Sequence, residues 1–396
     1  MNPAHQVIVL GAGPVGLTLA YRLAELGAQV TVLESEPAVS RQLRASTFHP
    51  PTLDFFSPSG ITGVLIKHGR ITPTWQIRLH ETTEHVTFDL SVLADETAHP
   101  YRLQCEQGVL SEELERRLLK YSSVTIRRGT AVQAVGQSAE SVWAQLQGSD
   151  ERLEAAYLVG CDGAHSLVRK AIGANFEGNI YPDMTLLATT PFDFGKLMPG
   201  LAGVNYIWQD SGTYSLLHLP HIWRVSLHPE SDQSLETEAD PVRIARRLDA
   251  LFPEAGPFEV TEVRPYRVHK RLASKWRHGR MLIAGDAAHL NNPKGGMGMN
   301  GGIHDAFCLA DLLIKRLGGA PDVVLDDYER QRLPVVRDDI IGQADKNHER
   351  MQLKDLTQRR ESLARLQALV DDRPRCQAYL RQTSMLEGLA KARALV

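Results

Sequence analysis

The sequence predicts an α/β fold in which a parallel sheet carries an inserted antiparallel sheet and a set of C-terminal helices. Three features predict it. A glycine-rich turn joins a strand to a helix at the N-terminus, two later apolar strands each run into an acidic motif, and short alternating strands fill residues 180–272. With 396 residues, 43% of them hydrophobic, the chain is long enough to bury a large core in two domains.

The N-terminal unit follows a strand, turn, helix, strand pattern. Residues 7–10 form an apolar strand, and residues 11–16 are Gly-Ala-Gly-Pro-Val-Gly. Apolar residues then recur at helical spacing up to Leu26, and residues 30–33 form a second apolar strand that ends at Glu34. A glycine fingerprint in this full context indicates a Rossmann dinucleotide-binding unit, whereas the glycines alone would be weak support.

Each residue type in this unit has a distinct task. Gly11 makes the tight turn, Gly13 lets the backbone approach a pyrophosphate, and Gly16 allows close packing of the helix. Glu34 is placed to accept ribose hydroxyls, which suits FAD or NAD and repels a 2′-phosphate. The turn residues expected beside the pyrophosphate also include Pro14 and Val15.

A later apolar strand, residues 281–284, runs directly into the carboxylate of Asp286. Open α/β sheets bind ligands at the carboxyl ends of their strands. Pro293 then stiffens a glycine-rich loop whose backbone can approach a flat ligand, and a helical pattern follows from Ile303. The loop therefore delivers a ligand to a helix N-terminus, where free N–H groups favour negative charge. Its glycines are Gly295, Gly296, Gly298, Gly301 and Gly302.

This stretch resembles the second flavin motif of the FAD-dependent aromatic-ring hydroxylases, the single-component monooxygenases of the para-hydroxybenzoate hydroxylase type. The match runs from Gly285 to Ala306. The resemblance implies a non-covalent FAD whose ribityl chain or ribose side meets Asp286 and whose isoalloxazine ring meets amides of the loop. The loop residues that it assigns to FAD are Pro293, Gly296, Gly298, Met299 and Asn300. The plainer alternative is a glycine-rich surface loop without a ligand.

A third motif resembles the same family. Residues 157–160 form a short apolar strand, which is followed by Asp162-Gly163 and then by Arg169. In these hydroxylases the Asp-Gly segment touches both FAD and the passing nicotinamide dinucleotide. The resemblance therefore implies that Asp162 binds FAD and that Arg169 contacts NAD(P)H.

Two further positions resemble FAD contacts of this family. Arg44 matches an Arg that lies along the cofactor, and Gln107 matches a Gln near the ribityl chain, with Gln104 as a competing assignment. For each of them a solvated loop side chain is the alternative. Because the three motifs occur in the family's order, the fold class predicted is a Rossmann-like FAD-binding domain with an inserted antiparallel-sheet substrate domain and C-terminal helices.

The inserted sheet is expected to cover the flavin. A strand pair within residues 74–88 is expected to join it. The other expected strands are residues 185–190, 203–208, 213–219 and 223–227. The predicted domains are a discontinuous FAD-binding domain (1–72, 100–178 and 273–345), a substrate-binding sheet domain (73–99 and 179–272) and C-terminal helices (346–396).

Candidate catalytic residues are His218, Tyr214 and Pro293, chosen because of their positions in the expected sheet and flavin loop. Ordinary packing in a sheet explains the first two equally well. His289 directly follows the Asp286 motif and is expected to be structural. Other pocket candidates are Tyr206, Trp208 and His221.

The resemblance implies an enzyme that uses NADH or NADPH and O2 to hydroxylate an electron-rich, phenol-like ring through a flavin C4a-hydroperoxide. Because the cofactor performs this step, no nucleophilic triad is needed. A flavin-dependent halogenase is disfavoured, since the sequence lacks a Trp-x-Trp-x-Ile-Pro segment. An FAD-dependent oxidase or reductase without oxygen insertion, and a non-enzymatic FAD-fold interaction protein, remain as alternatives.

Composition excludes other classes of function. The net charge is −3 and the basic residues are dispersed, which argues against nucleic-acid binding. The four cysteines are far apart and form no metal-ligand pattern, so no metal is expected and the thiols are expected to be reduced. No leader precedes the first strand and no apolar run reaches ~18 residues. We expect a cytoplasmic monomer or homodimer.

Overall fold

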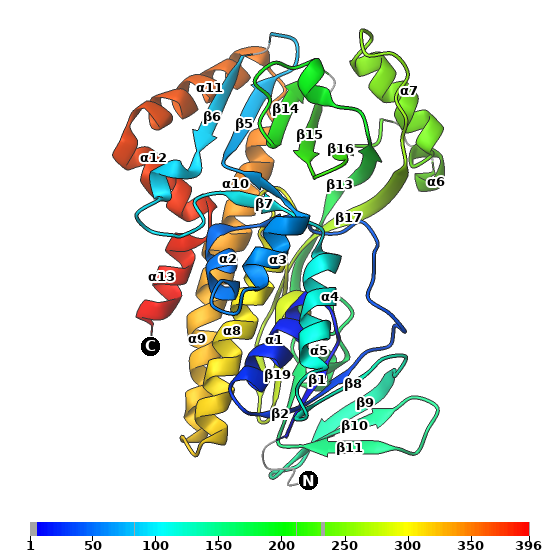
Figure 1. The fold of residues 1–396 in the computed structure, drawn as a ribbon, viewed down its shortest axis with the longest axis vertical. Coiled ribbons are helices and arrows are strands. Elements are labelled where there is room, and N and C mark those ends of the chain that lie inside the picture. Colours follow the sequence, from blue (N-terminus) through cyan, green and yellow to red (C-terminus); the bar gives the residue numbers. More distant parts are fainter. Residues whose placement is uncertain (1–5, 83, 211, 231–233, 396) are drawn as a thin grey trace.

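The computed structural model describes residues 6–82, 84–210, 212–230 and 234–395 (Figure 1). Its first sheet has six strands in the order β18-β19-β12-β1-β2-β8, and every pairing is parallel except that of β18 with β19. The N-terminal strand–helix–strand unit is therefore present as predicted. The strands are β1 (Gln6–Leu10), β2 (Gln29–Leu33), β8 (Val124–Arg127), β12 (Tyr157–Gly160), β18 (Arg277–His278) and β19 (Met281–Ile283).

Long helices pack beside this sheet. Helices α1 (Pro14–Glu25) and α8 (Gly298–Leu317) pack against each other, and α4 (Gln107–Leu118) packs on α1. The apolar side chains of the strands and helices form one continuous core, in which Val9, Leu17 and Ile303 are fully buried. This core holds the strand ends and helix N-termini in fixed relative positions.

The second large sheet has eight strands in the order β20-β17-β13-β16-β15-β14-β5-β6. All neighbours are antiparallel except β14 and β5, which are parallel. The predicted fold class is confirmed, although the sheet is not purely antiparallel. Its strands are β5 (Thr74–Leu79), β6 (His85–Asp89), β13 (Phe176–Thr190), β14 (Val204–Gln209), β15 (Gly212–His218), β16 (Trp223–Leu227), β17 (Glu262–Ala273) and β20 (His289–Leu290). The predicted domain limits stay a prediction.

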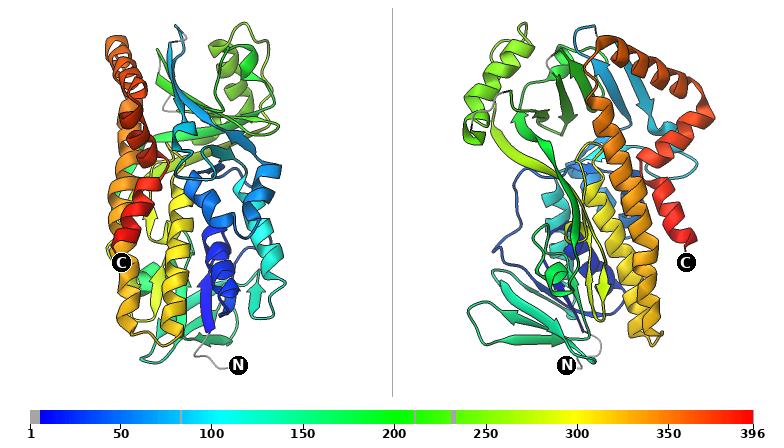
Figure 2. Two further views of the ribbon diagram at one scale, coloured as in Figure 1. Left: turned by 60° about the vertical axis from the view of Figure 1, so that its left-hand side comes forward. Right: turned by 180° about the vertical axis from the view of Figure 1, so that it is seen from behind.

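Both faces of this second sheet are covered. Trp75 and Trp208 lie in a core shared with helices α10 (Gly342–Met351), α11 (Leu356–Asp371) and α12 (Arg373–Thr383). Tyr214 and Phe252 lie in a separate core, on the side of α6 (Leu235–Glu238) and α7 (Pro241–Leu251). Figure 2 shows these two groups of helices on opposite sides of the sheet. Because successive strand residues point to opposite faces, each strand contributes to both cores.

Helix α9 (Asp326–Val335) continues through the π-helix η6 (Val336–Ile341) into α10, so that one long rod runs along both sheets (Figure 1). Helix α13 (Leu386–Ala394) packs on α9 and on α2 (Pro50–Phe56). The C-terminal helices thus contact both the part of the chain around the parallel sheet and the part around the second sheet. A small sheet that the sequence analysis did not identify, β9 (Val132–Gln137), β10 (Val142–Leu146) and β11 (Arg152–Ala155), lies at one end.

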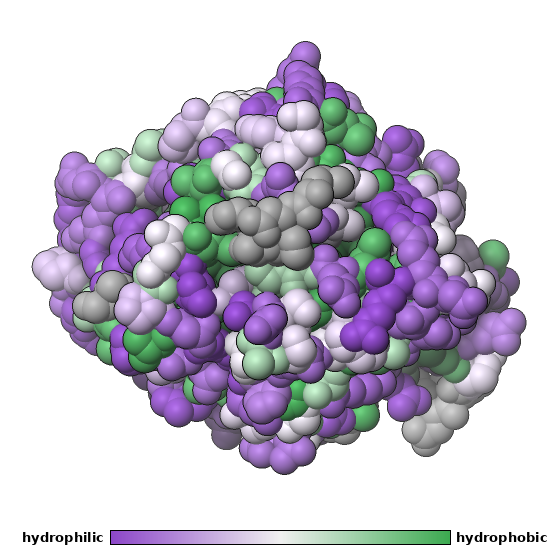
Figure 3. Space-filling model, turned by 90° about the horizontal axis from the view of Figure 1, so that it is seen from below, coloured by the Kyte–Doolittle hydropathy of each residue, from purple (hydrophilic) through white to green (hydrophobic). Residues whose placement is uncertain are grey.

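Seen from the end that carries the small sheet, apolar side chains are scattered among polar ones (Figure 3). Within the described ranges, no helix combines the length and the apolar character needed to cross a bilayer.

Candidate functional site

The predicted motifs begin in one row across the parallel sheet. Leu10 on β1 lies opposite Leu33 on β2 and Gly160 on β12, and Gly160 in turn lies opposite Ile283 on β19. Each strand ends at this row, so the segments that follow emerge at the same edge of the sheet, where α/β proteins bind ligands. Those segments begin with Gly11, Glu34, Cys161–Asp162 and Ala284–Asp286.

The glycines of the first turn divide into two kinds. A Cβ atom on Gly11 would lie 2.4 Å from the carbonyl oxygen of Cys161, and one on Gly16 would lie 2.0 Å from the carbonyl oxygen of Gly11. These two glycines are therefore required by protein contacts. A Cβ on Gly13 would have no atom within 4 Å, and Gly13 caps α1 without any side-chain hydrogen bond. The N-terminus of α1 is thus open to an anion, beside Pro14 and Val15.

Glu34 lies at the end of β2 and organises the same turn. Its Oε2 accepts a hydrogen bond from the N–H of Ala12 at 2.7 Å, and its Oε1 accepts one from the N–H of Glu36 at 2.9 Å. The carboxylate is therefore fixed beside the glycine turn while its side chain remains partly exposed. This is the position in which a carboxylate can receive ribose hydroxyls.

Asp286 follows β19 in a short 3-10 turn, Gly285–Ala287. The residue is exposed to solvent, although many protein atoms surround its carboxyl group. This desolvation raises the pKa of the carboxyl, whereas the nearby charges of His289 and Arg44 lower it. Arg44 is therefore close enough to act on Asp286, and its own carbonyl accepts a hydrogen bond from Arg224 Nη1 at 2.6 Å. The predicted cofactor residues Arg44 and Asp286 therefore lie near each other.

The Asp-Gly motif is held by hydrogen bonds to its own backbone. Oδ2 of Asp162 accepts hydrogen bonds from the N–H groups of Leu167 and Val168, at 2.7 and 3.2 Å. Oδ1 is buried without a partner, and burial raises the pKa of the carboxyl. A buried oxygen without a donor calls for a partner, and a bound ligand can provide one.

Arg169 links this motif to the Asp286 turn. Its Nη1 donates to the carbonyl of Ala287 at 2.9 Å and its Nη2 to the carbonyl of Ala164 at 2.7 Å. The guanidinium lies over the ring of Phe176, and only 5% of the residue is exposed. Arg169 therefore connects two cofactor motifs; its contact with NAD(P)H stays a prediction.

The structure separates the two candidate glutamines. Gln104 is fully buried in a small sheet of β3 (Thr47–Phe48), β4 (Arg70–Thr72) and β7 (Arg102–Gln104), where its Oε1 accepts a hydrogen bond from Thr47 Oγ1. Gln107 is partly exposed in the first turn of α4. Gln107 is therefore the glutamine that can reach a ligand.

The flavin-motif loop is fixed by protein contacts. A Cβ on Gly296, which has φ +68°, would lie 2.9 Å from Cβ of Thr47, and one on Gly298 would lie 2.9 Å from Oδ1 of Asn291. The side chain of Asn300 donates to the carbonyls of Thr47 and Gly296, both at 2.8 Å. The glycines thus serve close packing of the loop on β3, and the predicted cofactor contacts of these residues must come from the backbone.

The N-terminus of α8 is not capped by a side chain. Gly298, Met299 and Asn300 form its first turn, so their N–H groups have no partner within the helix. Pro293 is exposed, and its carbonyl accepts a hydrogen bond from the N–H of Gly296 at 2.9 Å. A 20-residue helix therefore directs its positive end toward the loop that the family resemblance assigns to the flavin.

A buried ionic cluster that the sequence analysis did not identify supports this loop from behind. Asp305 accepts hydrogen bonds from Arg332 Nε at 2.8 Å, from His289 Nε2 at 2.7 Å and from the N–H of Gly285 at 3.2 Å. Burial alone would raise the pKa of Asp305, but His289 and Arg332 together lower it to about 2. The cluster joins the Asp286 turn, α8 and α9.

A cavity opens between the same loop and the second sheet. Trp75 and Tyr206 line it from β5 and β14, Arg102 from β7, Gly295 from the flavin loop and Arg350 from α10. It encloses about 350 Å³ including the space at its mouth. Its aromatic walls, Trp75 and Tyr206, offer flat surfaces against which a ring can pack.

Two predicted catalytic residues do not line this cavity. Tyr214 and His218 point to the opposite face of the sheet, where Tyr214 bonds His80 and His218 stacks on Trp223 at 4.1 Å between ring centroids. Burial lowers the pKa of His218 to about 4. Their catalytic role stays a prediction, and strand alternation alone cannot tell which face of the sheet meets the flavin when both faces are covered.

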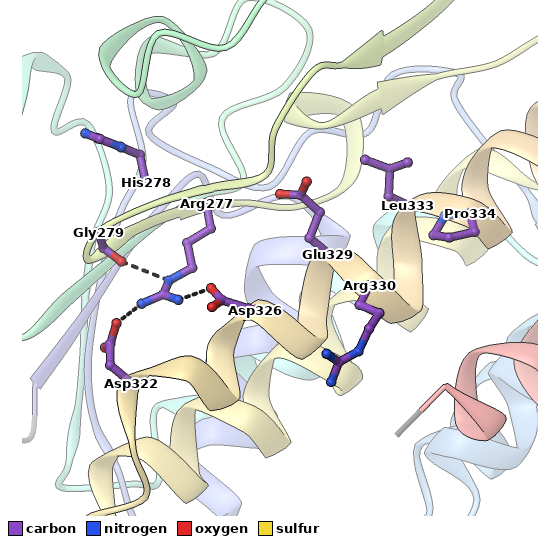
Figure 4. A pocket seen from close by; sticks show the side chains of 9 residues that line it. All are labelled: Arg277, His278, Gly279, Asp322, Asp326, Glu329, Arg330, Leu333 and Pro334. Atoms are coloured by element: carbon purple, nitrogen blue, oxygen red, sulfur yellow. Dashed lines mark hydrogen bonds and ion pairs between the residues drawn. The ribbon is translucent and has the colours of Figure 1, made fainter.

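A second pocket lies between β18 and α9 (Figure 4). Arg277 crosses it and forms ion pairs with Asp322 and Asp326. None of the predicted cofactor residues lines it among the described residues. We therefore take the motifs at the carboxyl ends of the parallel strands, together with the cavity lined by Trp75 and Gly295, as the candidate functional site.

The residues of this site fit a dinucleotide with an attached flat ring. Gly13 leaves room for a pyrophosphate, Glu34 is placed for a ribose, Asp162 has an unpartnered buried oxygen, and α8 presents an uncapped N-terminus. The fold and the site together define an FAD-dependent aromatic hydroxylase, and the comparisons with known proteins agree.

Residues 4–340 match the family described as FAD binding domain. The para-nitrophenol 4-monooxygenase of Pseudomonas sp. (strain WBC-3) is 33% identical, over 98% of this chain and 97% of that protein. The 6-hydroxy-3-succinoylpyridine 3-monooxygenase of Pseudomonas putida (strain DSM 28022 / S16) is 33% identical, over 84% of this chain and 85% of that protein.

Solved structures show the same likeness. The p-nitrophenol 4-monooxygenase of Pseudomonas putida DLL-E4 superposes with a TM-score of 0.89 at 31% identity, and 97% of each chain is covered. The aklavinone-11 hydroxylase, solved with FAD and aklavinone, has a TM-score of 0.76 at 28% identity, over 88% of this chain and 69% of that chain. The chain belongs to the FAD-binding family of aromatic hydroxylases, and FAD is its cofactor.

Proposed function

We propose that this enzyme hydroxylates a single-ring phenol or hydroxypyridine at the expense of NAD(P)H and O2. The reaction consumes one NAD(P)H, one proton and one O2; one oxygen atom enters the ring and the other leaves as water. We further propose that it acts in the cytoplasm as a monomer or homodimer. The observation that carries the proposal is the narrow aromatic cavity against the flavin loop.

The residues that would hold FAD follow from the geometry. Gly13 and the N-terminus of α1 would meet the pyrophosphate, Glu34 the ribose, and Asp286 the ribityl side. When bound, FAD supplies the electron storage and oxygen activation that no side chain can provide. The uncapped N-terminus of α8 would stabilise negative charge on the reduced ring by roughly 0.3–2 kcal/mol.

The cavity walls would keep the reacting ring dry and oriented. Trp75 and Tyr206 provide flat surfaces, and Gly295 brings the loop backbone to the cavity without a side chain. Exclusion of water favours transfer of oxygen to the ring over release of peroxide. The described lining residues include no His, Asp or Glu, so we assign no carboxylate or imidazole base to the protein.

The substrate class is proposed from two relatives. One is named for para-nitrophenol and the other for 6-hydroxy-3-succinoylpyridine, and both names describe a small hydroxylated ring with an oxygen-rich substituent. The aromatic walls of the cavity, Trp75 and Tyr206, suit such a ring. A para-substituted phenol is therefore the first substrate class to test.

The test is a panel of phenols and hydroxypyridines, 4-nitrophenol and 6-hydroxy-3-succinoylpyridine among them. For each compound, NAD(P)H oxidation, hydrogen peroxide and ring product are measured together. We expect at least one compound to stimulate NAD(P)H oxidation with product formed in a near-equal amount. Stimulation that yields peroxide alone would instead identify an FAD-dependent oxidase without oxygen insertion.

A further inference from the structure

The charged side chains described around the cavity beside the flavin loop are all positive. Its described lining residues include three cationic side chains and no carboxylate. Two of the cationic residues make other contacts: Arg350 Nη1 donates to the hydroxyl of Tyr379 at 3.2 Å, and Lys294 also has a partner. The third, Arg102, is different.

Arg102 is 2% exposed, and neither its Nε nor its Nη1 has a hydrogen-bond partner. Its guanidinium carbon lies 5.1 Å from the centre of the Trp75 ring, on one wall of the cavity. Burial lowers the pKa of Arg102, and the groups that oppose this effect are the phenols of Tyr206 and Tyr379. No carboxylate among the described residues offsets its charge there.

Such an arrangement is costly for the protein alone. A buried cation without a counter-ion destabilises a fold by several kcal/mol, and unpaired buried N–H groups add to that cost. By contrast, Arg332 bonds Asp305, Arg224 bonds Glu106, and Arg169 donates to two backbone carbonyls. The unpaired state of Arg102 therefore points to a partner that arrives from outside.

We propose that Arg102 binds an oxyanion carried by the aromatic substrate, so that the enzyme selects anionic rings over neutral rings of the same shape. The oxyanion is either a substituent such as a carboxylate or the ionised phenol itself. Tyr206 and Trp75 hold the ring while Arg102 fixes one end of it. This inference rests on the proposed function, because it takes the cavity as the substrate site.

The experiment measures binding to the FAD-loaded enzyme through the change in flavin fluorescence, with no turnover. The first arm compares 4-hydroxybenzoate with 4-hydroxybenzamide near neutral pH, because the two differ in charge and hardly in shape. The second arm titrates 4-nitrophenol below and above its own pKa. The variants are Arg102→Gln and, as a matched control, Arg78→Gln. Arg78 is equally buried but faces away from the cavity and bonds Gln76.

We expect the anionic form in at least one arm to bind about tenfold more tightly, since hydrogen bonds to charged groups are worth that much. Arg102→Gln should abolish the preference, and Arg78→Gln should retain it. The ligand-free Arg102→Gln protein should melt at the same or a higher temperature, since a costly buried charge is gone. A merely structural arginine would give a lower melting temperature.

An equal preference in the wild type and in Arg102→Gln would overturn the proposal, and so would a wild type that binds no anion of either arm. If Arg102→Gln does not fold, the structural role is the correct one. These outcomes are independent of the proposed hydroxylation. A protein that turns over phenols without preferring anions loses only this inference, and one that binds anions without hydroxylating them loses only the proposed function.

Discussion

The carboxylate of Asp305 and the guanidinium of Arg332 form an ion pair, with Oδ1 2.8 Å from Nε, in which both side chains are at most 1% exposed. His289 bonds the other oxygen of the same carboxylate. The anion thus sits between two side chains from outside its own helix, directly behind the cofactor loop. Removal of its charge would leave Arg332 buried and unpaired.

Asp305→Asn should therefore lower the free energy of unfolding by about 3–5 kcal/mol and weaken FAD retention. Asp311→Asn is the control: it lies on the same helix and pairs with Arg22, but its side chain is 50% exposed. That variant should change stability by less than about 1 kcal/mol. Urea unfolding of the FAD-loaded protein measures both. Equal effects of the two substitutions would mean that the buried cluster does not support the loop.

The glycines of the first turn give a second test. Gly16→Ala should destabilise even the FAD-free protein, by about 1–3 kcal/mol, because its Cβ would meet the Gly11 carbonyl oxygen at 2.0 Å. Gly13→Ala should leave the FAD-free protein unchanged and weaken FAD binding on the order of tenfold, because only the cofactor occupies that space. Thermal melts without FAD and FAD titrations measure the two effects. Normal FAD affinity in Gly13→Ala would place the pyrophosphate elsewhere.

His49 predicts a pH dependence of stability. It is fully buried, its Nε2 bonds the carbonyl of Gly295, and burial together with the charge of Arg102 lowers its pKa from 6.5 to about 3. The unfolded chain therefore takes up a proton at this residue below pH 6.5 while the folded protein does not. The stability contribution is complete above pH 6.5 and falls as the pH drops toward 3.

His49→Gln removes this proton uptake. Between about pH 8 and about pH 5, the wild type should lose about 2 kcal/mol more than the variant, since the slope is about 1.4 kcal/mol per pH unit for one proton. Other buried histidines, such as His304, contribute equally to both proteins and cancel. Urea unfolding at the two pH values measures the difference. Parallel losses would show that His49 is protonated in the folded state.

The cofactor loop predicts an effect on coupling. Gly296→Ala would strain a residue at φ +68° and press a methyl group onto Thr47, which should move the loop away from β3 and open the cavity to water. The peroxide formed per NAD(P)H should rise while FAD stays bound. Gly319→Ala is the control, because it has φ +102° with nothing within 4 Å of its Cβ and lies beyond the end of α8. Full coupling in Gly296→Ala would separate the loop from the reaction site.

The fold and the cofactor site were predictable because their signals are local. A strand, a glycine turn, a helix and an acidic residue stand together in the first 34 residues, and Asp162 and Asp286 each follow their own apolar strand. The residues of each such unit are close in the sequence, so its pattern can be recognised without knowing how the rest of the chain packs. These motifs lie side by side because each follows the carboxyl end of a strand in the same parallel sheet.

The substrate side was not predictable in the same way. Tyr214 and His218 were expected in the pocket, but the sheet is covered on both faces, so alternation alone could not orient them. Arg102 carries no motif; its only sequence signal is a charge beside Tyr101 and Leu103 in a short apolar segment. Its role depends on what α10 and the cofactor loop place around it, and those segments are about 190 or more residues away in the chain.

In the proposed reaction, an oxygen atom from O2 is inserted into an aromatic ring bound in the cavity. The direct measurement is mass spectrometry of the product formed under ¹⁸O₂ from FAD-loaded enzyme, NAD(P)H and the best compound of the panel. We expect one ¹⁸O atom in each ring product, and none when the label is supplied only as H₂¹⁸O. Product without ¹⁸O from the gas, or NAD(P)H oxidation that yields only labelled peroxide with every compound of the panel, would contradict the proposed reaction.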